Sequence, residues 1–433
     1  MAASRRVNSI FRSISTKGII VRKLWRLAAA AALAAAATLS AGSVASAAAT
    51  PGSLDPTFGN GGTVVTNGDG TPADAVLQAN GDILVTVGGS TTSGVLRYLP
   101  DGKLDTTFGT NGFAPISSSS MSLGASGIAV QANGDILVAS GATNSSDTVQ
   151  GIAVERLLPN GSLDATFGNH GVAFLQLAAG EPATPAIVQE SNGDILVGGD
   201  VFVVMKRDDF FKGIVARFTS SGAPDTTFGS GGAVTSQALG QINTLGVDPS
   251  GDIFTLPTAA EISPTGTLDG SVTQSTIVAS SRGGPDTFLS DGNSVQTSTV
   301  FIHKDDNEVH TQGFLANGAA NPSFASSEIH YSASNPNSSR DSGSESAVEP
   351  NGDVVVAGAR FLGSSVFGLA RFTPTGALDT TFGSAGTVTT DIQGDESVDA
   401  GLLVQPNRDI IAVGFTENNS TGVSGVALAR YIG

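Results

Sequence analysis

The sequence has no cysteine, few basic residues and a single tryptophan. The absence of cysteine excludes disulfides, thiolate metal sites and a lipid anchor on cysteine. There are 21 Lys and Arg against 38 Asp and Glu, and the first 47 residues hold seven of the basic residues and no acidic one. The remainder therefore carries 14 basic and 38 acidic residues, a net charge of −24. Such a surface repels nucleic acid and anionic membranes but is compatible with divalent cations.

Residues 1–47 have the pattern of a secretory signal peptide. Seven basic residues precede an alanine-rich apolar run from Leu27 to Leu39, and Ala45-Ser46-Ala47 supplies a small-residue cleavage site. The apolar run is too short for a good membrane span, and no second run follows. We therefore predict a signal peptide at 1–47 and a single domain at 48–433, secreted or associated with the cell envelope and without a membrane span.

The rest of the chain is organised by a repeated hexapeptide, first seen as Leu54-Asp55-Pro56-Thr57-Phe58-Gly59. Taking its Asp as the marker, copies stand at 55, 105, 164, 225 and 379, and degenerate copies at 269 and 321. Such a period indicates one supersecondary unit that stacks on its neighbours. Within the hexapeptide, we expect Asp to cap a turn, Phe to fill the contact between units and Gly to adopt a positive φ.

Each repeat is predicted to hold four short strands. In one repeat, the strand Gly127–Gln131, an Asn-Gly turn and the strand Ile136–Ser140 form a hairpin, and Ile152–Leu157 and Gly171–Phe174 follow. Two further markers also occur seven times. The tight turn is assigned to Gly81, Gly134, Gly193, Gly251, Asn307, Gly352 and Arg408. The end of the third strand is assigned to Arg97, Arg156, Arg217, Glu261, Gly313, Arg371 and Arg430.

Four strands in each of seven units predict an all-β, seven-bladed β-propeller. In the complete repeats Arg lies eight residues before Asp, whereas Arg430 lies three residues from the end of the sequence. If Gly433 were joined to Pro51, Arg430 would fall eight positions before Asp55. We therefore predict that the N- and C-terminal strands complete one blade together and close the ring. We expect the protein to be a monomer.

The pattern A-R-[FY]-x-P-x-G-x-L-D-x-T-F-G-x-x-G, followed by Q-x-N-G-D-I-[LV]-V, resembles the delta-60 repeat family of secreted bacterial proteins. Residues 371–387 match it almost throughout, and the resemblance spans the chain after residue 47. It is similar, more loosely, to NHL repeats. The resemblance implies a propeller and transfers no catalytic residues. The single Trp25 lies in the predicted signal peptide, which argues against WD-repeat and quinone-binding propellers.

The arginines and aspartates of the repeat are predicted to form internal ion pairs, because both are replaced together in the repeat of Gly313 and Asn321. These structural residues are Arg97, Arg156, Arg217, Arg371 and Arg430 with Asp105, Asp164, Asp225, Asp379 and Asp55. Glu261 with Asp269 departs from the pattern and places two carboxylates where they could share a proton or hold a cation.

Two further departures are candidate binding sites. The loop 205–212 is one candidate binding surface; its cationic and aromatic residues are Lys206, Arg207, Phe210, Phe211 and Lys212. The other is the segment 300–310. A turn at Asp306-Asn307 would set His303 opposite His310, in positions that are apolar in other repeats. Two imidazoles can bind one divalent ion when a third ligand is added, and His330, Asp305 and Glu308 are nearest in sequence. Asp305 and Glu308 are predicted to point to the opposite face.

No nucleophile motif, phosphate loop or metalloprotease helix is found, and no cofactor is evident beyond a divalent cation. The sequence favours an exported, non-catalytic propeller that is a binding or surface scaffold for a glycan, a protein or a divalent cation. The alternative is an exported hydrolase or lyase with its site at the mouth of the propeller channel. An inert protein of the cell envelope is a third class.

Overall fold

Each of the five intact copies of the hexapeptide folds into a turn that leads from the third strand of a blade to the fourth. At the copy around residue 164, Asp164 Oδ1 accepts hydrogen bonds from the amide (3.0 Å) and the hydroxyl (2.6 Å) of Thr166. Gly168 has φ of +53°, which glycine adopts without steric cost. Its N–H donates to the carbonyl of Ser221 at 2.8 Å. Ser221 belongs to the next blade, so one turn both caps its own blade and holds its neighbour.

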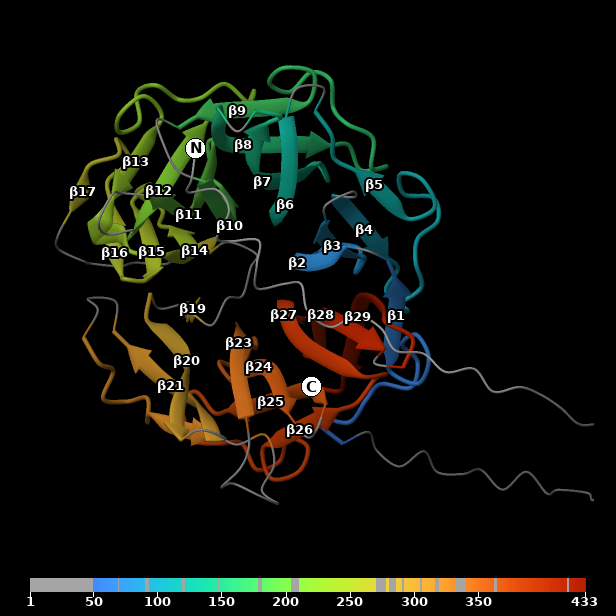
Figure 1. Cartoon of the computed structure of the whole chain (residues 1–433). Helices are drawn as coiled ribbons and strands as arrows, with labels where there is room; N and C mark the ends of the chain where they lie inside the picture. The colour runs from blue at the N-terminus through green and yellow to red at the C-terminus, as the bar shows by residue number, and fades with distance from the viewer. Residues whose placement is uncertain are drawn as a thin grey trace, which may run out of the picture. The chain divides into compact units, whose positions relative to one another are not determined.

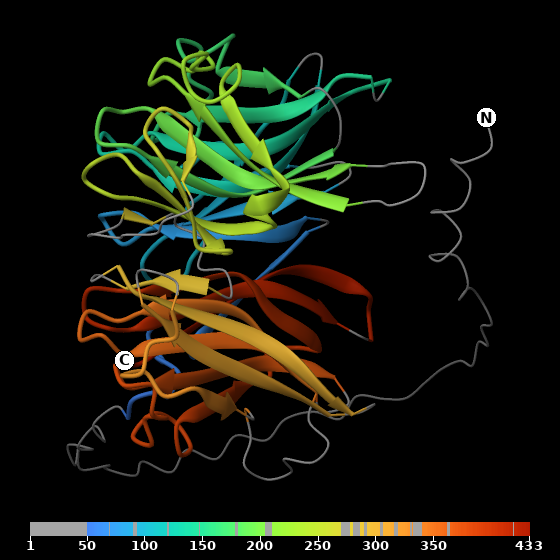
Figure 2. The same ribbon diagram turned by 90° about the vertical axis from the view of Figure 1, so that its left-hand side faces the viewer.

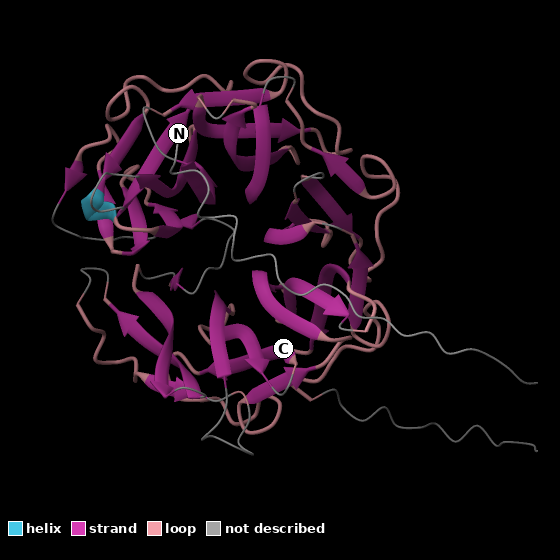
Figure 3. Cartoon of the chain, viewed as in Figure 1, coloured by secondary structure: helices cyan, strands magenta, loops and turns pink. Residues whose placement is uncertain are grey.

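The computed structural model describes residues 50–68, 70–89, 93–118, 121–146, 148–177, 181–203, 210–269, 278–279, 286–289, 292–303, 306–315, 319–329, 331, 340–361, 364–418 and 420–433. The predicted signal peptide lies outside them. Strands dominate the described residues, with one short 3-10 helix at Gln237–Leu239 (Figure 3). None of the helical structure described has the length and apolarity needed to cross a membrane.

The described strands of the unit Ala48–Gly433 form seven blades arranged as a ring (Figure 1). Blade 1 comprises β2 (Thr71–Leu77), β3 (Ile83–Gly88), β4 (Gly94–Tyr98) and β5 (Phe113–Pro115). Blade 2 comprises β6 (Met121–Val130), β7 (Ile136–Asn144), β8 (Gln150–Leu157) and β9 (Val172–Gln176). Blade 3 comprises β10 (Glu181–Gln189), β11 (Ile195–Val203), β12 (Phe210–Phe218) and β13 (Ala233–Ser236). In each blade the strands pair antiparallel in chain order.

Blade 4 comprises β14 (Ile242–Val247), β15 (Ile253–Pro257), β16 (Ala260–Ile262) and β17 (Leu268–Asp269), and β18 (Val278–Ala279) pairs with the free side of β14. Blade 5 comprises β19 (Asp286–Phe288), β20 (Ser294–His303), β21 (Asp306–Phe314) and β22 (Ser327–Ile329). Blade 6 comprises β23 (Arg340–Val348), β24 (Val354–Phe361), β25 (Ser365–Phe372) and β26 (Thr387–Thr390). Figure 2 shows the hairpin of β20 and β21, in gold, as a long two-stranded ribbon.

Blade 7 is built from both ends of the fold. It comprises β27 (Asp395–Val404), β28 (Ile410–Asn418), β29 (Val423–Tyr431) and, as its outer strand, β1 (Thr63–Asn67). The register of β1 on β29 runs from Thr63 opposite Ala429 to Asn67 opposite Gly425. Arg430 also donates through its N–H to the carbonyl of Gly62 at 2.9 Å. The predicted closure of the ring by the terminal strands is confirmed.

The hydrophobic core is divided into clusters that lie between neighbouring blades. Between blades 7 and 1, for example, Ile411 and Leu428 pack with Ile83 and Val85. The repeated Phe stands in these clusters and is fully buried in five blades. These residues are Phe58, Phe108, Phe167, Phe228 and Phe382. Between the described parts of blades 4 and 5 the buried cluster consists of Phe254, Leu256 and Phe288.

The sequence prediction of the tight turn between the first two strands is wrong for blade 5. In blade 2, Gln131 N–H donates to Asp135 O at 2.8 Å across this turn, and Gly134 has φ of +89°. The same geometry occurs in blade 5 at Leu289, whose N–H donates to Asn293 O at 2.7 Å, and at Gly292 with φ of +84°. The turn of this repeat is therefore at Gly292 and not at Asn307. Consequently β20 and β21 are the second and third strands of blade 5.

Candidate functional site

The arginines of the repeat lie against their aspartates in five blades. An Arg nitrogen lies 2.6–2.8 Å from an Asp Oδ2 in each ion pair. The guanidinium also stacks on the repeated Phe, with 4.4 Å from Arg97 Cζ to the centroid of Phe108. In blade 1 the guanidinium also contacts the next blade, because Arg97 Nη1 donates a hydrogen bond to Pro159 O at 2.6 Å. We call each set of Arg, Asp and Phe a clamp.

The clamps hold their carboxylates in the ionised state. Hydrogen bonds from the Thr166 hydroxyl, acting against burial, and then from the Thr166 amide and Arg156 lower the pKa of Asp164 below its usual range. The pKa values of Asp55, Asp105, Asp225 and Asp379 are lowered by the same kinds of partner. A carboxylate whose two oxygens are both engaged and whose pKa is lowered is a poor proton donor or acceptor near neutral pH. The repeated Asp residues are therefore structural in this arrangement.

Blade 4 has carboxylates where other blades have a clamp. Glu261 lies opposite Asp269 in the register of β16 and β17. Burial, followed by the nearby charges of Asp248 and Asp269, raises the pKa of Asp252. Mutual repulsion of this kind is expected where the cation of the repeat is replaced by an acid. The shared proton or cation suggested for Glu261 and Asp269 stays a prediction.

The loop 205–212 falls largely outside the described residues. Lys206 and Arg207 are among the residues that are not described, and Phe210 begins β12 with a side chain that is not described either. Phe211 is 44% exposed, and its ring centroid lies 5.0 Å from that of Phe202. Lys212 is half-buried. The described part of this loop therefore presents one aromatic ring to solvent, and its role as a binding surface stays a prediction.

The register of β20 on β21 separates the two histidines of the predicted metal site. His310 lies opposite Ser298, and His303 lies opposite Asp306. The prediction that His303 faces His310 is wrong, because it assumed a turn at Asp306-Asn307 and the register shifts by a bulge between Phe301 and His303. The side chain of His303 and the whole of His330 lie outside the described residues.

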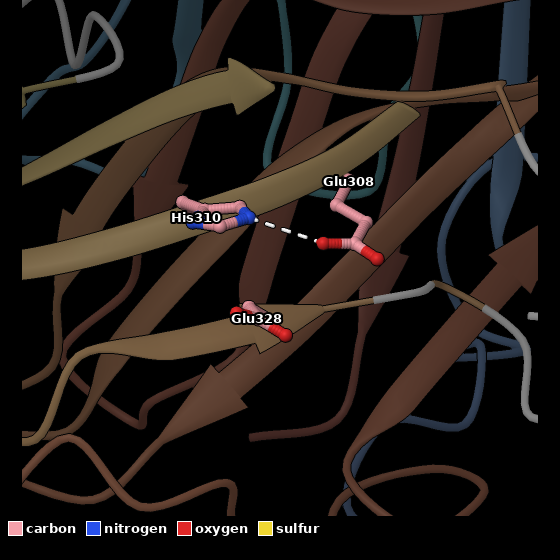
Figure 4. Close-up of side chains that lie close together, drawn as sticks. All are labelled: Glu308, His310 and Glu328. Atoms are coloured by element: carbon pink, nitrogen blue, oxygen red, sulfur yellow. Dashed lines mark hydrogen bonds and ion pairs between the residues drawn. The ribbon is translucent and has the colours of Figure 1, made fainter. Parts of the chain in front are cut away.

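Two glutamates, Glu308 and Glu328, lie close to His310 instead (Figure 4). Glu308 lies two residues before it on β21, and Glu328 is its cross-strand partner on β22. One ligand atom of each side chain lies within 4.8 Å of the others, and His310 Nε2 is 3.2 Å from Glu308 Oε2. Glu308 was predicted to point away from His310, which is wrong because residues two apart on a strand share a face. We call Glu308, His310 and Glu328 the blade-5 triad.

The triad lies on the face of blade 5 that is turned toward blade 4. The opposite face carries Val309 and Ile329, which pack in the core shared with blade 6. On the same face as the triad, Gln296 Nε2 donates to Pro257 O of blade 4 at 2.9 Å. Because side chains alternate along a strand, His310 and Glu308 share the direction of Gln296 across the hairpin.

The position of His310 is apolar and fully buried in several other blades. It lies three residues before the arginine position, where blades 2, 3 and 7 have Ala153, Ile214 and Ala427, each 0% exposed. Here a polar triad is present instead, with His310 half-buried and Glu328 exposed. The sequence reasoning identified His310 but missed Glu328. The repeat gives no signal for it: Ala153 pairs with Phe174 and Ile214 with Thr235, 21 residues on in each case, an offset that would place residue 331 and not Glu328 opposite His310.

A family model described as "Domain of unknown function (DUF5122) beta-propeller" matches residues 78–108, 131–167, 190–228 and 349–382. These segments fall in blades 1, 2, 3 and 6, each of which carries a clamp. The chain is a β-propeller repeat protein. The name delta-60 remains a resemblance. No curated protein matches this β-propeller repeat protein.

Several solved structures are similar to this chain at low identity. Virginiamycin B lyase from Staphylococcus aureus is 13% identical, with 84% of this chain and 97% of that chain covered and a TM-score of 0.39. The GH93 α-L-arabinofuranosidase of Fusarium graminearum is 10% identical, with 88% and 97% covered and a TM-score of 0.42. Drosophila Plexin A, solved with Semaphorin 1b, is 10% identical, with 88% of each chain covered and a TM-score of 0.37. At these scores the similarities do not bear on activity.

Proposed function

We propose that this β-propeller repeat protein is an exported, non-catalytic binding scaffold, secreted or associated with the cell envelope. One observation carries the proposal. The repeated acids are engaged in clamps that hold blades together, whereas one group of polar side chains that breaks the repeat, the blade-5 triad, lies together on one face of blade 5. In a repeat fold, the shared positions supply stability and the departures supply recognition.

The net charge of the chain limits the classes of ligand that the protein can bind. A net charge of −24 outside the signal peptide disfavours polyanions and favours polar or cationic surfaces. Neutral extracellular glycans and basic proteins meet this requirement. We place the recognition surface on the blade-4-facing side of blade 5, around the blade-5 triad.

The alternative function, a hydrolase or lyase, would need an accessible carboxyl that holds a proton near neutral pH. Asp286 on the first strand of blade 5 has a pKa raised by burial to about 6. However, it is only 3% exposed, and its backbone carbonyl accepts a hydrogen bond from Thr244 Oγ1 at 3.0 Å. Asp286 therefore joins the first strands of blades 4 and 5 and is too buried to be such a carboxyl.

Affinity electrophoresis against a panel of neutral extracellular polysaccharides tests the proposal. We expect at least one polymer to retard the protein, with no new reducing or unsaturated chain ends after prolonged incubation. Retardation should weaken in Glu308→Gln and persist in Glu417→Gln, which changes an exposed glutamate on β28. Appearance of new chain ends would establish the enzyme instead. Absence of binding to the glycans and to basic test proteins would leave an inert envelope protein and overturn the scaffold.

A further inference from the structure

We propose that Glu308, His310 and Glu328 form a mononuclear site for a divalent metal ion. The inference rests on the proposed function, because it names a ligand class for the same face of blade 5. Three potential ligand atoms, from two carboxylates and one imidazole, lie within 4.8 Å of one another. Two donors that are each about 2.0–2.2 Å from one ion lie at most about 4.4 Å apart, so small side-chain adjustments would bring all three atoms onto one ion.

The backbone presents these donors from two neighbouring strands. Glu308 and His310 project from the same face of β21, and Glu328 projects beside His310 from β22, as Figure 4 shows. The register is fixed by Val309 and Ile329, which are paired opposite each other and buried against blade 6. Side chains on paired strands have less freedom than side chains on loops, so less conformational entropy is lost when they bind an ion.

The electrostatics of the triad also favour a cation. Two glutamates lie close together, and their mutual repulsion is relieved when a positive charge is placed between them. Protonated His310 could supply one such charge through its 3.2 Å contact with Glu308. A divalent ion supplies two, and it contacts Glu328 as well. The competing interpretation is thus a simple His–Glu ion pair, and the two differ in whether Glu328 takes part.

The mixture of donors selects the kind of ion. Imidazole is a ligand for zinc and other transition metals, and carboxylates also bind Mn²⁺, whereas Ca²⁺ prefers oxygen ligands throughout. We therefore assign the site to Zn²⁺ or a similar first-row ion. Three protein ligands leave at least one coordination position open. Since Glu328 is exposed, that position can be reached by water or by an oxygen atom of a bound glycan or protein.

Isothermal titration of the chelator-treated, full-length folded protein with Zn²⁺, and separately with Mn²⁺, tests the site. We expect one ion per chain for the wild type and a loss of affinity of at least tenfold in both His310→Gln and Glu328→Gln. Glu328→Gln is decisive, because this exposed residue is not needed for a His–Glu ion pair and its loss should not impair folding. Co²⁺ added to the wild type should give visible absorption typical of a nitrogen and oxygen ligand set, and the two variants should not.

His170→Asn is the matched control. It removes an exposed histidine from the turn before β9, where φ is +54° and asparagine is well tolerated. The control should bind Zn²⁺ as the wild type does. The site is refuted if the wild type binds no ion, or if Glu328→Gln binds as tightly as the wild type. Glycan or protein binding without metal binding would refute only the metal site, and metal binding without either would refute only the scaffold.

Discussion

Glu155 offers a test of how the propeller responds to pH. It lies on β8 of blade 2 with 0% exposure, on the side of the strand where Ala153 packs against blade 1. Its Oε2 accepts a hydrogen bond from Ser140 Oγ at 2.8 Å, while its Oε1 has no partner among the described residues. Burial, opposed only in part by the Ser140 hydroxyl, raises the pKa of Glu155 from 4.5 to about 8. The folded protein therefore holds this carboxyl protonated at neutral pH.

The sign of the effect on stability follows from the two pKa values. Below pH 4.5 both folded and unfolded chains hold the proton, and Glu155 contributes its full stability. Between pH 4.5 and about 8 the unfolded chain releases the proton and the folded chain keeps it. The free energy of unfolding then falls by up to about 1.4 kcal/mol per pH unit, and by a total on the order of 5 kcal/mol at most. Above pH 8 the contribution is constant.

Glu155→Gln removes the ionisable group and keeps its shape and its hydrogen bond to Ser140. We expect the variant to unfold at a higher temperature than the wild type at pH 8 and at nearly the same temperature at pH 4.5. Calorimetric or circular-dichroism melts at half-unit steps between these pH values measure the difference. Glu417→Gln, at an exposed site, should melt as the wild type throughout. A difference between Glu155→Gln and wild type that does not change with pH would show that Glu155 is ionised in the folded protein.

Three other predictions concern the clamps and the closure of the ring. Arg371 is 3% exposed and contacts both Asp379 and Glu349, so Arg371→Ala should cost about 3–5 kcal/mol, and a double-mutant cycle with Asp379→Ala should show non-additive losses in urea unfolding. Deletion of Val426–Gly433 removes four of the five cross-strand partners of β1, so we expect aggregation or a much lower Tm; a full-length Tm in the truncated protein would contradict the observed closure. Arg408 adopts φ of +75° and pairs with Glu349, so Arg408→Gly should relieve backbone strain but lose the ion pair; because salt weakens the wild-type ion pair, the Tm of the variant relative to that of the wild type should be higher in high salt than in low salt.

The architecture could be predicted from the sequence because the repeated residues occur at fixed spacings that correspond to strands and turns. The offset of eight residues between Arg and Asp is the span from the end of the third strand to the turn, as Arg97 and Asp105 show. The same offset carried across the termini predicted the pairing of β1 with β29. Because the same clamp residues recur in five blades, an interpretation of one of these blades applies to the other four.

The candidate site could be predicted only in part because it lies where the repeat is degenerate. The pair Asp306-Asn307 resembles a turn, and that repeat has no clamp from which the register could be determined. The competing pair Asp291-Gly292 is the better turn signal, and Gly292 indeed has φ of +84°. Setting the turn there moves His310 to the third strand, where its partner in the fourth strand is Glu328 at an offset that the other blades do not share. That pairing depends on the fourth strand, whose short length and irregular sequence hide it from pattern analysis.

The clamps also determine how the ring behaves as a chain of coupled units. A linear array of repeats loses its end units first, but a closed ring has no end unit and must break at a joint. In four consecutive joints the arginine of one blade donates a hydrogen bond to a backbone carbonyl of the next blade. The acceptors are Pro100 for blade 7, Pro159 for blade 1, Ser220 for blade 2 and Pro264 for blade 3. Blades 4 and 5 have Glu261 and Gly313 in place of that arginine. Both joints of blade 5 therefore lack this contact, and the joint with blade 4 also has the smallest buried cluster among the described residues. Amide hydrogen exchange should be fastest beside that joint, and an ion bound there would slow it selectively.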